Sequence, residues 1–222
     1  MIRRPPRSTP KPSSAASDVY KRQNLPLVIV DADEVIVHFA KPFISYLEER
    51  GWALELNGYT LSNSIKNIKT KKILENRKSQ KLVIDFIEKE THRQPITEGA
   101  LKTLNNISKF SQIIILTNVP GYAYEKRLKN FKDLNISFPI IMNQGPKGLA
   151  LKQLCKGMQK PIIFIDDNLS QIESAKKFVP SIYRFHFTGC DLVRKFLPKS
   201  LAATHNPKSW QEIEILCNRF LI

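Results

Sequence analysis

The sequence predicts an α/β fold in which a parallel β-sheet is flanked by helices. Short apolar runs that are typical of buried strands recur along the chain, and amphipathic segments with helical spacing lie between them. Strands that alternate with helices indicate a parallel sheet with right-handed crossovers. Several of these runs are followed directly by polar side chains, so we expect the carboxyl ends of the strands to form a site.

The first predicted strand, Leu25–Val30, is the element around which the others are arranged. Its sequence LPLVIV is apolar, as expected for a strand that is buried on both faces, and it is followed by Asp31 and Asp33. Carboxylates in this position lie where open α/β sheets bind ligands, and their oxygen atoms can hold a divalent cation. The alternative interpretation is a loop of solvated acids after a core strand.

Residues 39–92 are predicted to form an insertion with two helices. Phe39–Arg50 places apolar residues at helical spacing, and a second helix is expected over Lys71–Thr91. Between residues 57 and 81 the only acid is Glu75, against a run of basic side chains: Lys66, Lys69, Lys71, Lys72, Arg77, Lys78 and Lys81. This run is either a solvated face or a basic lid that attracts an anionic substrate.

From residue 95 onward the alternation of helix and strand is regular. A helix over Thr97–Phe110, with Thr97 as a candidate N-cap, precedes a strand, Ile113–Leu116, that leads into Thr117 and Asn118. The other predicted strands are Phe138–Met142, Pro161–Ile165 and Ile182–Phe187, and the other predicted helices are Tyr122–Leu134, Lys147–Gly157 and Leu169–Phe178. The apolar residues from Trp210 to Leu221 indicate a C-terminal helix that docks on the core or on a partner.

Several of these strand ends carry side chains that suit phosphoryl transfer. Asp31 and Asp33 follow the first strand, Thr117 and Asn118 follow the second, and Asp166 and Asp167 follow the fourth, which is preceded by a helix that Lys147 opens. Because parallel strands end at the same edge of a sheet, these groups are expected to converge on one crevice.

Each of these groups has a role that phosphoryl chemistry requires. A carboxylate can attack phosphorus to form an aspartyl-phosphate, and Asp31 is the candidate nucleophile. Asp33 can protonate the leaving oxygen and later deprotonate water. The phosphoryl oxygens call for a hydroxyl, a backbone N–H and a cation, which Thr117, Asn118 and Lys147 would supply. A cluster of carboxylates calls for Mg²⁺, for which the candidate ligands are Asp31, Asp33, Asp166 and Asp167.

The same residues also have plain structural interpretations. Thr117 and Asn118 could simply begin a turn, and the segment 166–168 could cap the following helix. Lys147 could be an exposed lysine, with Lys152 and Lys160 as rival cations. The order of the groups and their placement at strand ends favour the site.

On these residues the chain resembles the haloacid dehalogenase-like (HAD) hydrolase superfamily over Leu25–Phe187. VIVDADEVI, IIILTN, Lys147 and IIFIDDN stand in the order of the four motifs of that superfamily. The resemblance implies a Rossmann-like core, Mg²⁺ and an aspartyl nucleophile. It assigns Asp31 as nucleophile, Asp33 as acid and base, Thr117 and Lys147 as stabilisers of the phosphate and the intermediate, and Asp166 with Asp167 as metal carboxylates. Many members have Gly where this chain has Glu34, and this bulky acid must point away from the site.

The resemblance also implies a domain organisation and a substrate class. It divides the chain into a leader, 1–23, a HAD-like core, 24–38 and 93–222, and a small helical cap, 39–92. The presence of Asp33 favours phosphate ester hydrolysis, since dehalogenases of the superfamily lack this second Asp. The layout of the cap resembles the 5'(3')-deoxyribonucleotidase-like branch, which implies a nucleoside monophosphate. The candidates for stacking on a base, which could equally be core residues, are Phe43, Tyr46, Trp52 and Tyr59.

Composition indicates the cellular setting of the protein and the kinds of partner that it can have. The three cysteines and the four histidines show no metal-ligand spacing, which favours a reduced, cytoplasmic protein with ordinary structural histidines. No apolar run approaches the roughly 20 residues that a membrane-spanning helix needs. Residues 1–23 are predicted to be disordered, and they resemble translated sequencing-adapter read-through. Their six basic residues against one acid account for +5 of the net charge of +15, which weakens any inference of nucleic-acid binding.

Two functions are therefore expected from the sequence. The first is a Mg²⁺-dependent phosphatase that hydrolyses a small phosphorylated metabolite through an aspartyl-phosphate. The second is a non-catalytic binding or regulatory protein on the same fold that contacts nucleic acid through its basic insertion. The sequence does not indicate the oligomeric state.

Overall fold

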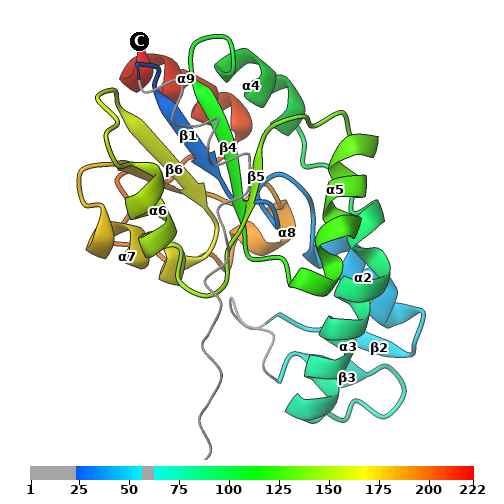
Figure 1. Ribbon diagram of the computed structural model, residues 1–222. Coiled ribbons are helices and arrows are strands. Elements are labelled where there is room, and N and C mark those ends of the chain that lie inside the picture. Colours follow the sequence, from blue (N-terminus) through cyan, green and yellow to red (C-terminus); the bar gives the residue numbers. More distant parts are fainter. Residues whose placement is uncertain (1–23, 57–62) are drawn as a thin grey trace, which may run out of the picture.

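The computed structural model describes residues 24–56 and 63–222, and this part of the chain contains a five-stranded parallel sheet (Figure 1). The strands are β1 (Leu27–Val30), β4 (Gln112–Thr117), β5 (Ile140–Met142), β6 (Ile162–Asp166) and β7 (Tyr183–His186). Their order in the sheet is β5-β4-β1-β6-β7, and every pairing between them is parallel. The predicted α/β class is confirmed, whereas the predictions for residues 1–23 lie outside the described residues.

Strand β1 lies in the middle of the sheet, and its side chains alternate between two hydrophobic clusters. Val28 and Val30 belong to one cluster, and Leu27 and Ile29 belong to the other. The first cluster includes side chains from α4 (Ala100–Ile107), α5 (Tyr124–Asp133) and α9 (Trp210–Leu221), and the second includes side chains from α6 (Gly148–Leu154) and α7 (Leu169–Phe178). Helices therefore cover both faces, which explains why β1 is apolar at every position.

Thr97 was expected to cap the helix after the insertion, and this prediction is wrong. Helix α4 begins at Ala100, and Gly99 occupies the N-cap position with a φ of 84°. The Thr97 hydroxyl instead donates to the carbonyl of Val35 at 2.7 Å and accepts from the indole nitrogen of Trp210 at 3.0 Å. Thr97 thus connects the loop after β1 to α9, which packs against α4 on the core rather than standing free.

The insertion is not purely helical, which corrects the predicted helical cap. Between α2 (Ala40–Glu48) and α3 (Asn76–Glu90), the strands β2 (Trp52–Leu54) and β3 (Ile65–Asn67) form an antiparallel pair. Helix α3 begins at Asn76 rather than at Lys71 because the preceding residues still belong to this pair: the amide of Leu74 donates to the carbonyl of Ile65 at 2.8 Å. The insertion has its own apolar cluster, which includes Phe43, Tyr46, Leu47, Ile65, Leu74 and Phe86.

Short helical turns complete the connections at the site. These are η2 (Thr91–Arg93), η3 (Gly121–Ala123) and α8 (Asp191–Arg194). Most of the basic side chains of the insertion are exposed, and Lys66 and Lys78 pair with Glu55 and Glu75.

Within residues 24–56 and 63–222, every helix is too short or too polar to span a membrane.

Candidate active site

The carboxyl ends of β1, β4 and β6 lie at one edge of the sheet. In the register of the sheet, Val30 is paired with both Ile115 and Ile165, and β4 and β6 continue past this level to Thr117 and Asp166, so the three strands end at the same edge. Asp31 follows Val30 directly, and Asp166 is the last residue of β6. A pocket of about 380 Å³, lined by residues of this edge and of the insertion, opens here.

Lys147 joins two of the predicted carboxylates. Its Nζ lies 2.5 Å from Oδ1 of Asp31 and 2.7 Å from Oδ2 of Asp166, and the residue is 1% exposed. Its backbone is held in place because its amide donates to Oε1 of Gln171 on α7 at 2.7 Å. The alternative of an exposed lysine at a helix start is therefore wrong, and Lys147 is the cation that the carboxylates share.

The electrostatics of this group follow from its burial. Burial raises the pKa of Asp31 to about 7; Lys147 opposes this rise, while the neighbouring carboxylates of Asp166 and Asp33 add to it. Burial alone would lower the pKa of Lys147, but the two carboxylates that it contacts outweigh this effect and raise its pKa above the ordinary value. Lys147 is thus held in its charged form, whereas burial favours the neutral form of Asp31 more than water would.

Asp31, Asp166 and Asp167 form a group that could hold a metal ion. Each offers a carboxylate oxygen, these oxygens lie within 4.8 Å of one another, and all three residues are buried. Three buried carboxylates exceed the single positive charge of Lys147, and a donor set made only of oxygen suits a hard cation such as Mg²⁺. The residues present therefore fit the expected metal.

Asp33 lies apart from this group of potential ligands. Its Oδ1 accepts from Nη2 of Arg127 at 2.6 Å and from Nε2 of Gln94 at 3.3 Å. Asp33 does line the same pocket as Asp31. Asp33 is thus near Asp31 in the same pocket, but it pairs with Arg127 rather than with Lys147, and it is not one of the three carboxylates grouped as potential metal ligands.

Thr117 and Asn118 end β4 and lead into the pocket wall. Thr117 is completely buried, and its hydroxyl oxygen accepts from the amide of Val119 at 3.2 Å. Among the described residues, the pocket is lined here by Asn118, Val119 and Pro120, and not by Thr117. The Asn118 side chain is engaged in the loop, since its Nδ2 donates to the carbonyl of Gly145 at 2.9 Å.

Two residues that were not predicted from the sequence, Arg127 and Gln94, are both buried beside Asp33. Nη2 of Arg127 also donates to Oε1 of Gln94 at 2.6 Å, and its Nη1 donates to Asn130 at 3.0 Å. One signal was present in the sequence: Arg127 stands four residues before Phe131, so it shares a helix face with a core aromatic residue. A charged residue on an apolar face indicates a buried partner.

Glu34 occupies the turn after Asp33 with a left-handed backbone. Its φ is 60°, a conformation that glycine adopts freely and that costs energy for other residues. Glu34 therefore adopts a backbone conformation typical of the glycine that many members have at this position. The carboxylate is directed to the start of α2, where Oε1 accepts from the amides of Phe39 and Ala40. Burial raises the pKa of Glu34, and hydrogen bonds from these two amides oppose the rise.

The outer wall of the pocket is apolar. It is formed by side chains of the insertion and of α8: Phe39, Ala40, Phe43, Leu54, Leu56, Ile87 and Val193. Of the aromatic residues predicted to stack on a base, Phe43 lies in this wall. Tyr46 and Trp52 belong to the apolar cluster of the insertion and are not among the described residues that line the pocket, and Tyr59 lies outside the described residues.

Comparisons with known proteins bear on the fold. No protein-family model matches the sequence, and no curated protein is significantly similar to it in sequence. A HAD-superfamily hydrolase from Ehrlichia chaffeensis is similar in structure with a TM-score of 0.52 and 15% identity, over 88% of this chain and 97% of that chain. A haloacid dehalogenase-like family protein from Streptococcus pneumoniae gives a TM-score of 0.55 and 14% identity, over 88% and 98% of the two chains.

A third similar structure is that of YfnB from Bacillus subtilis, which is described as a HAD-hydrolase and was solved bound to magnesium. It gives a TM-score of 0.59 and 12% identity, over 87% of this chain and 99% of that chain. These similarities run over nearly the whole of each chain, and they agree with the order of the motifs and with the sheet. The chain has the fold of the haloacid dehalogenase-like hydrolases.

Proposed function

We propose that the chain is a Mg²⁺-dependent phosphatase that hydrolyses a small phosphate monoester through an aspartyl-phosphate on Asp31. The observation that carries this proposal is the contact of one buried lysine with two carboxylates from different strands, beside a pocket. A buried ammonium in this position can stabilise the charge that develops on a phosphoryl group. No packing requirement of the core explains a buried lysine among three buried acids.

In the first proposed step, an oxygen of Asp31 attacks phosphorus while the bond from phosphorus to the leaving oxygen breaks. Asp33 gives its proton to that oxygen, so the leaving group departs as a neutral alcohol. In the second step, water attacks the phosphorus of the aspartyl-phosphate and passes a proton to Asp33. Phosphate leaves, and Asp31 is restored as a carboxylate.

The remaining residues would stabilise charge on the phosphoryl group and keep the reacting groups in position. Lys147 would contact the phosphoryl group and hold Asp31 in its ionised form. Mg²⁺, held by Asp31, Asp166 and Asp167, would supply further positive charge to the phosphoryl oxygens when bound. Thr117 would act from behind the pocket wall: its hydroxyl accepts from the amide of Val119 and so supports the turn that places Asn118 and Val119 along the pocket.

The apolar outer wall of the pocket favours a substrate with an apolar part. The leaving group would lie against Phe39, Phe43 and Leu54, which offer no charged side chain to bind a second anionic group. We propose a phosphate ester with a partly apolar body, such as a nucleoside monophosphate, whose base has an apolar face. Arg127 and Asn118 also line the pocket, where their hydrogen bonds to Asp33 and to the carbonyl of Gly145 hold the polar side of the wall in place.

The test is a panel of phosphate monoesters, which includes nucleoside monophosphates and a generic aryl phosphate, assayed with Mg²⁺ and with EDTA. The variant Asp31→Asn removes the proposed nucleophile with little change in shape, and Asp133→Asn makes the same change at a carboxylate on α5 that pairs with Lys129. We expect turnover with Mg²⁺, loss of turnover with EDTA or in Asp31→Asn, and normal turnover in Asp133→Asn.

The chemistry can be checked separately from the choice of substrate. Mass spectrometry of rapidly quenched reactions should show a phosphoryl group on the wild-type chain and none on Asp31→Asn. Turnover that continues undiminished in EDTA or in Asp31→Asn contradicts the proposal. So does the absence of turnover across the whole panel, with folded protein and Mg²⁺ present.

A further inference from the structure

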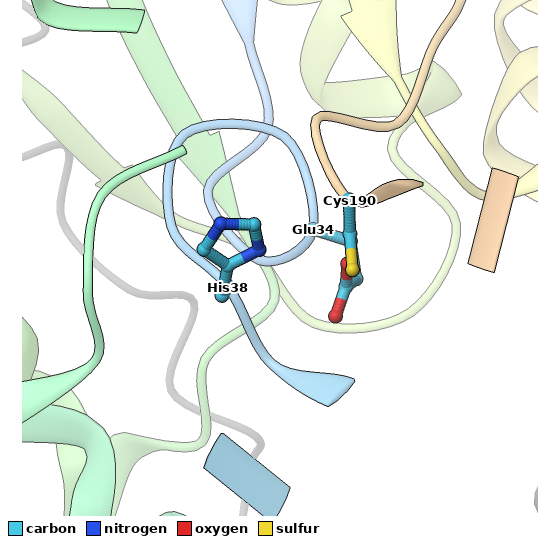
Figure 2. A group of neighbouring side chains, drawn as sticks. All are labelled: Glu34, His38 and Cys190. Atoms are coloured by element: carbon cyan, nitrogen blue, oxygen red, sulfur yellow. The ribbon is translucent and has the colours of Figure 1, made fainter. Parts of the chain in front are cut away.

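Three buried residues from distant parts of the chain meet beside the start of α2. Glu34 and His38 come from the loop after β1, and Cys190 comes from the segment between β7 and α8 (Figure 2). A carboxylate oxygen, an imidazole nitrogen and the thiol sulfur lie within 4.8 Å of one another. The three residues are 8%, 9% and 0% exposed, in that order.

One atom in this group, Nδ1 of His38, is polar, buried and without a hydrogen-bond partner in the described part of the chain. The carboxylate of Glu34 and the thiol of Cys190 already interact with one another: their hydrogen bond is among the causes that set the pKa of each. Buried polar atoms are almost always paired, so each such atom needs an explanation, and an unplaced ion is one of the common ones. Figure 2 shows a ring nitrogen of His38 turned towards Glu34 and Cys190, in agreement with a shared ligand between them.

The surrounding backbone holds these side chains in position. Oε1 of Glu34 accepts from the amide of Phe39 at 2.9 Å, which leaves the other carboxylate oxygen on the side of the cluster. The carbonyl of Glu34 accepts from the amide of Gly189 at 2.7 Å and from the hydroxyl of Thr188 at 3.1 Å. The two loops are thus fastened to one another independently of the cluster, so the ligand atoms are already close together before any ion binds.

We propose that Glu34, His38 and Cys190 bind a zinc-type transition-metal ion, at a site separate from the carboxylates around Lys147. One sulfur, one nitrogen and one oxygen ligand make a set that favours Zn²⁺ or Co²⁺ over Mg²⁺, which prefers oxygen alone. Tetrahedral zinc sites place their ligand atoms roughly 3.3–3.8 Å apart, so binding draws the three side chains closer together. Cys190 binds as a thiolate, and its proton is released to solvent.

The site would join two loops at the active-site pocket. Glu34 lines the pocket and follows Asp33 directly, while Cys190 precedes α8, which contributes Val193 to the apolar wall. The bound ion would therefore connect the loop that carries Asp31 and Asp33 to the segment after β7. This effect differs from that of Mg²⁺ in the proposed reaction, because the two sites share no ligand.

The test uses the full chain with excess Mg²⁺, so that the carboxylate cluster is filled, and titrates it with Co²⁺. A cobalt ion bound to thiolate has a near-ultraviolet charge-transfer absorption that carboxylate ligands do not produce. We expect one Co²⁺ per chain to bind with this absorption, and Zn²⁺ to displace the bound Co²⁺. The absorption and the Zn²⁺-sensitive binding should be lost in Cys190→Ser and in His38→Gln. They should be retained in the matched controls Cys155→Ser and His92→Gln.

Folding is checked by thermal unfolding of each variant without metal. If Cys190→Ser fails to fold, Glu34→Gln serves instead, since its amide oxygen can still accept from the start of α2 while it removes a charged ligand. In that variant we expect weaker Co²⁺ binding with the thiolate absorption still detectable at high Co²⁺. Cobalt that binds without the thiolate absorption, or that binds Cys190→Ser or Glu34→Gln as tightly as wild type, overturns the proposal. None of these readouts depends on phosphatase activity.

Discussion

The guanidinium of Arg127 lies 2.6 Å from a carboxylate oxygen of Asp33, and the same nitrogen lies 2.6 Å from Oε1 of Gln94. Arg127 is 1% exposed, so this ion pair is shielded from water on the arginine side, whereas the Asp33 side chain is 32% exposed. The contact joins the loop after β1, the segment that follows the insertion, and α5. The orientation of Asp33 therefore depends on residues far from it in the sequence.

Replacement of Arg127 by methionine should destabilise the protein. The change fills a similar volume but leaves Oε1 of Gln94 and Oδ1 of Asn130 without their arginine donor. An unsatisfied buried acceptor costs about 1–3 kcal/mol, and we expect a loss of this size in the free energy of unfolding, measured with urea. Lys129→Met on the same helix, where the lysine is exposed, should change it by less than about 0.5 kcal/mol. Equal effects of the two substitutions would count against a structural role for the Arg127 contacts.

Replacement of Lys147 by methionine should leave Asp31 and Asp166 facing one another without their shared ammonium. Removal of one partner from a buried ion pair costs about 3–5 kcal/mol, which we expect to measure as a lower free energy of unfolding in EDTA. Mg²⁺ should then raise the melting temperature of Lys147→Met more than that of the wild type, because the carboxylates have lost their own cation. The exposed Lys152→Met provides the control, and a variant that Mg²⁺ fails to stabilise more than wild type would contradict the grouping.

The substitution Asp31→Asn should abolish activity and yet stabilise the metal-free protein at high pH. Burial, with Asp166 and Asp33, raises the pKa of Asp31 from 3.8 to about 7 in spite of Lys147. Between these two values the native state binds more protons than the unfolded state, so the stability of the wild type falls as the pH rises. Asparagine does not ionise, so the advantage of Asp31→Asn should grow from about pH 5 to about pH 8. Denaturation curves in EDTA at both pH values measure the difference in unfolding free energy between Asp31→Asn and the wild type. A difference that shrinks as the pH rises would refute the expectation.

Gly148, the first residue of α6, lies close against α7. A Cβ at this position would lie 2.5 Å from Oγ and 2.6 Å from the backbone oxygen of Ser174. Gly148→Ala should therefore push α6 away from α7, cost about 1–3 kcal/mol of unfolding free energy, and reduce turnover because Lys147 is the preceding residue. Gly121→Ala, where a Cβ meets nothing within 4 Å, is the matched control. If thermal unfolding shows no difference between the two alanine variants, the close packing of α6 against α7 at Gly148 does not contribute to stability.

Most of the fold could be predicted because its strands are short apolar runs and its helices have clear periodicity. Strand β1 and its two neighbours follow directly from such runs, and the α7 bounds match the prediction. The pairing of β2 with β3 could not be predicted in this way, since each strand has only three residues and mixed polarity. The N-cap of α4 was missed for a related reason: the hydroxyl of Thr97 is used by β1-loop carbonyls and by Trp210, a contact that local sequence does not record.

The gathering of Asp31, Lys147 and Asp166 could also be predicted, because residues at the carboxyl ends of parallel strands must share an edge. The partners of Asp33 could not be predicted from the sequence. Arg127 lies in the segment KRLKNFKD, where its spacing from Phe131 indicates burial but does not identify its partner, since Asp33 and Gln94 come from distant parts of the chain. The cluster of Glu34, His38 and Cys190 could not be predicted, because Cys190 lies far along the chain from the other two and only the fold brings the three together.

The central place of β1 also matters for how the chain is made. Translation delivers this strand before either of its neighbours, β4 and β6, so it leaves the ribosome long before it can pair. Until then the segment LVIV exposes two apolar faces and two unpaired edges, which is the kind of stretch that chaperones bind and that aggregates when left uncovered. Yield during expression should accordingly depend more on the rate of synthesis and on chaperone supply than on the final stability of the folded protein.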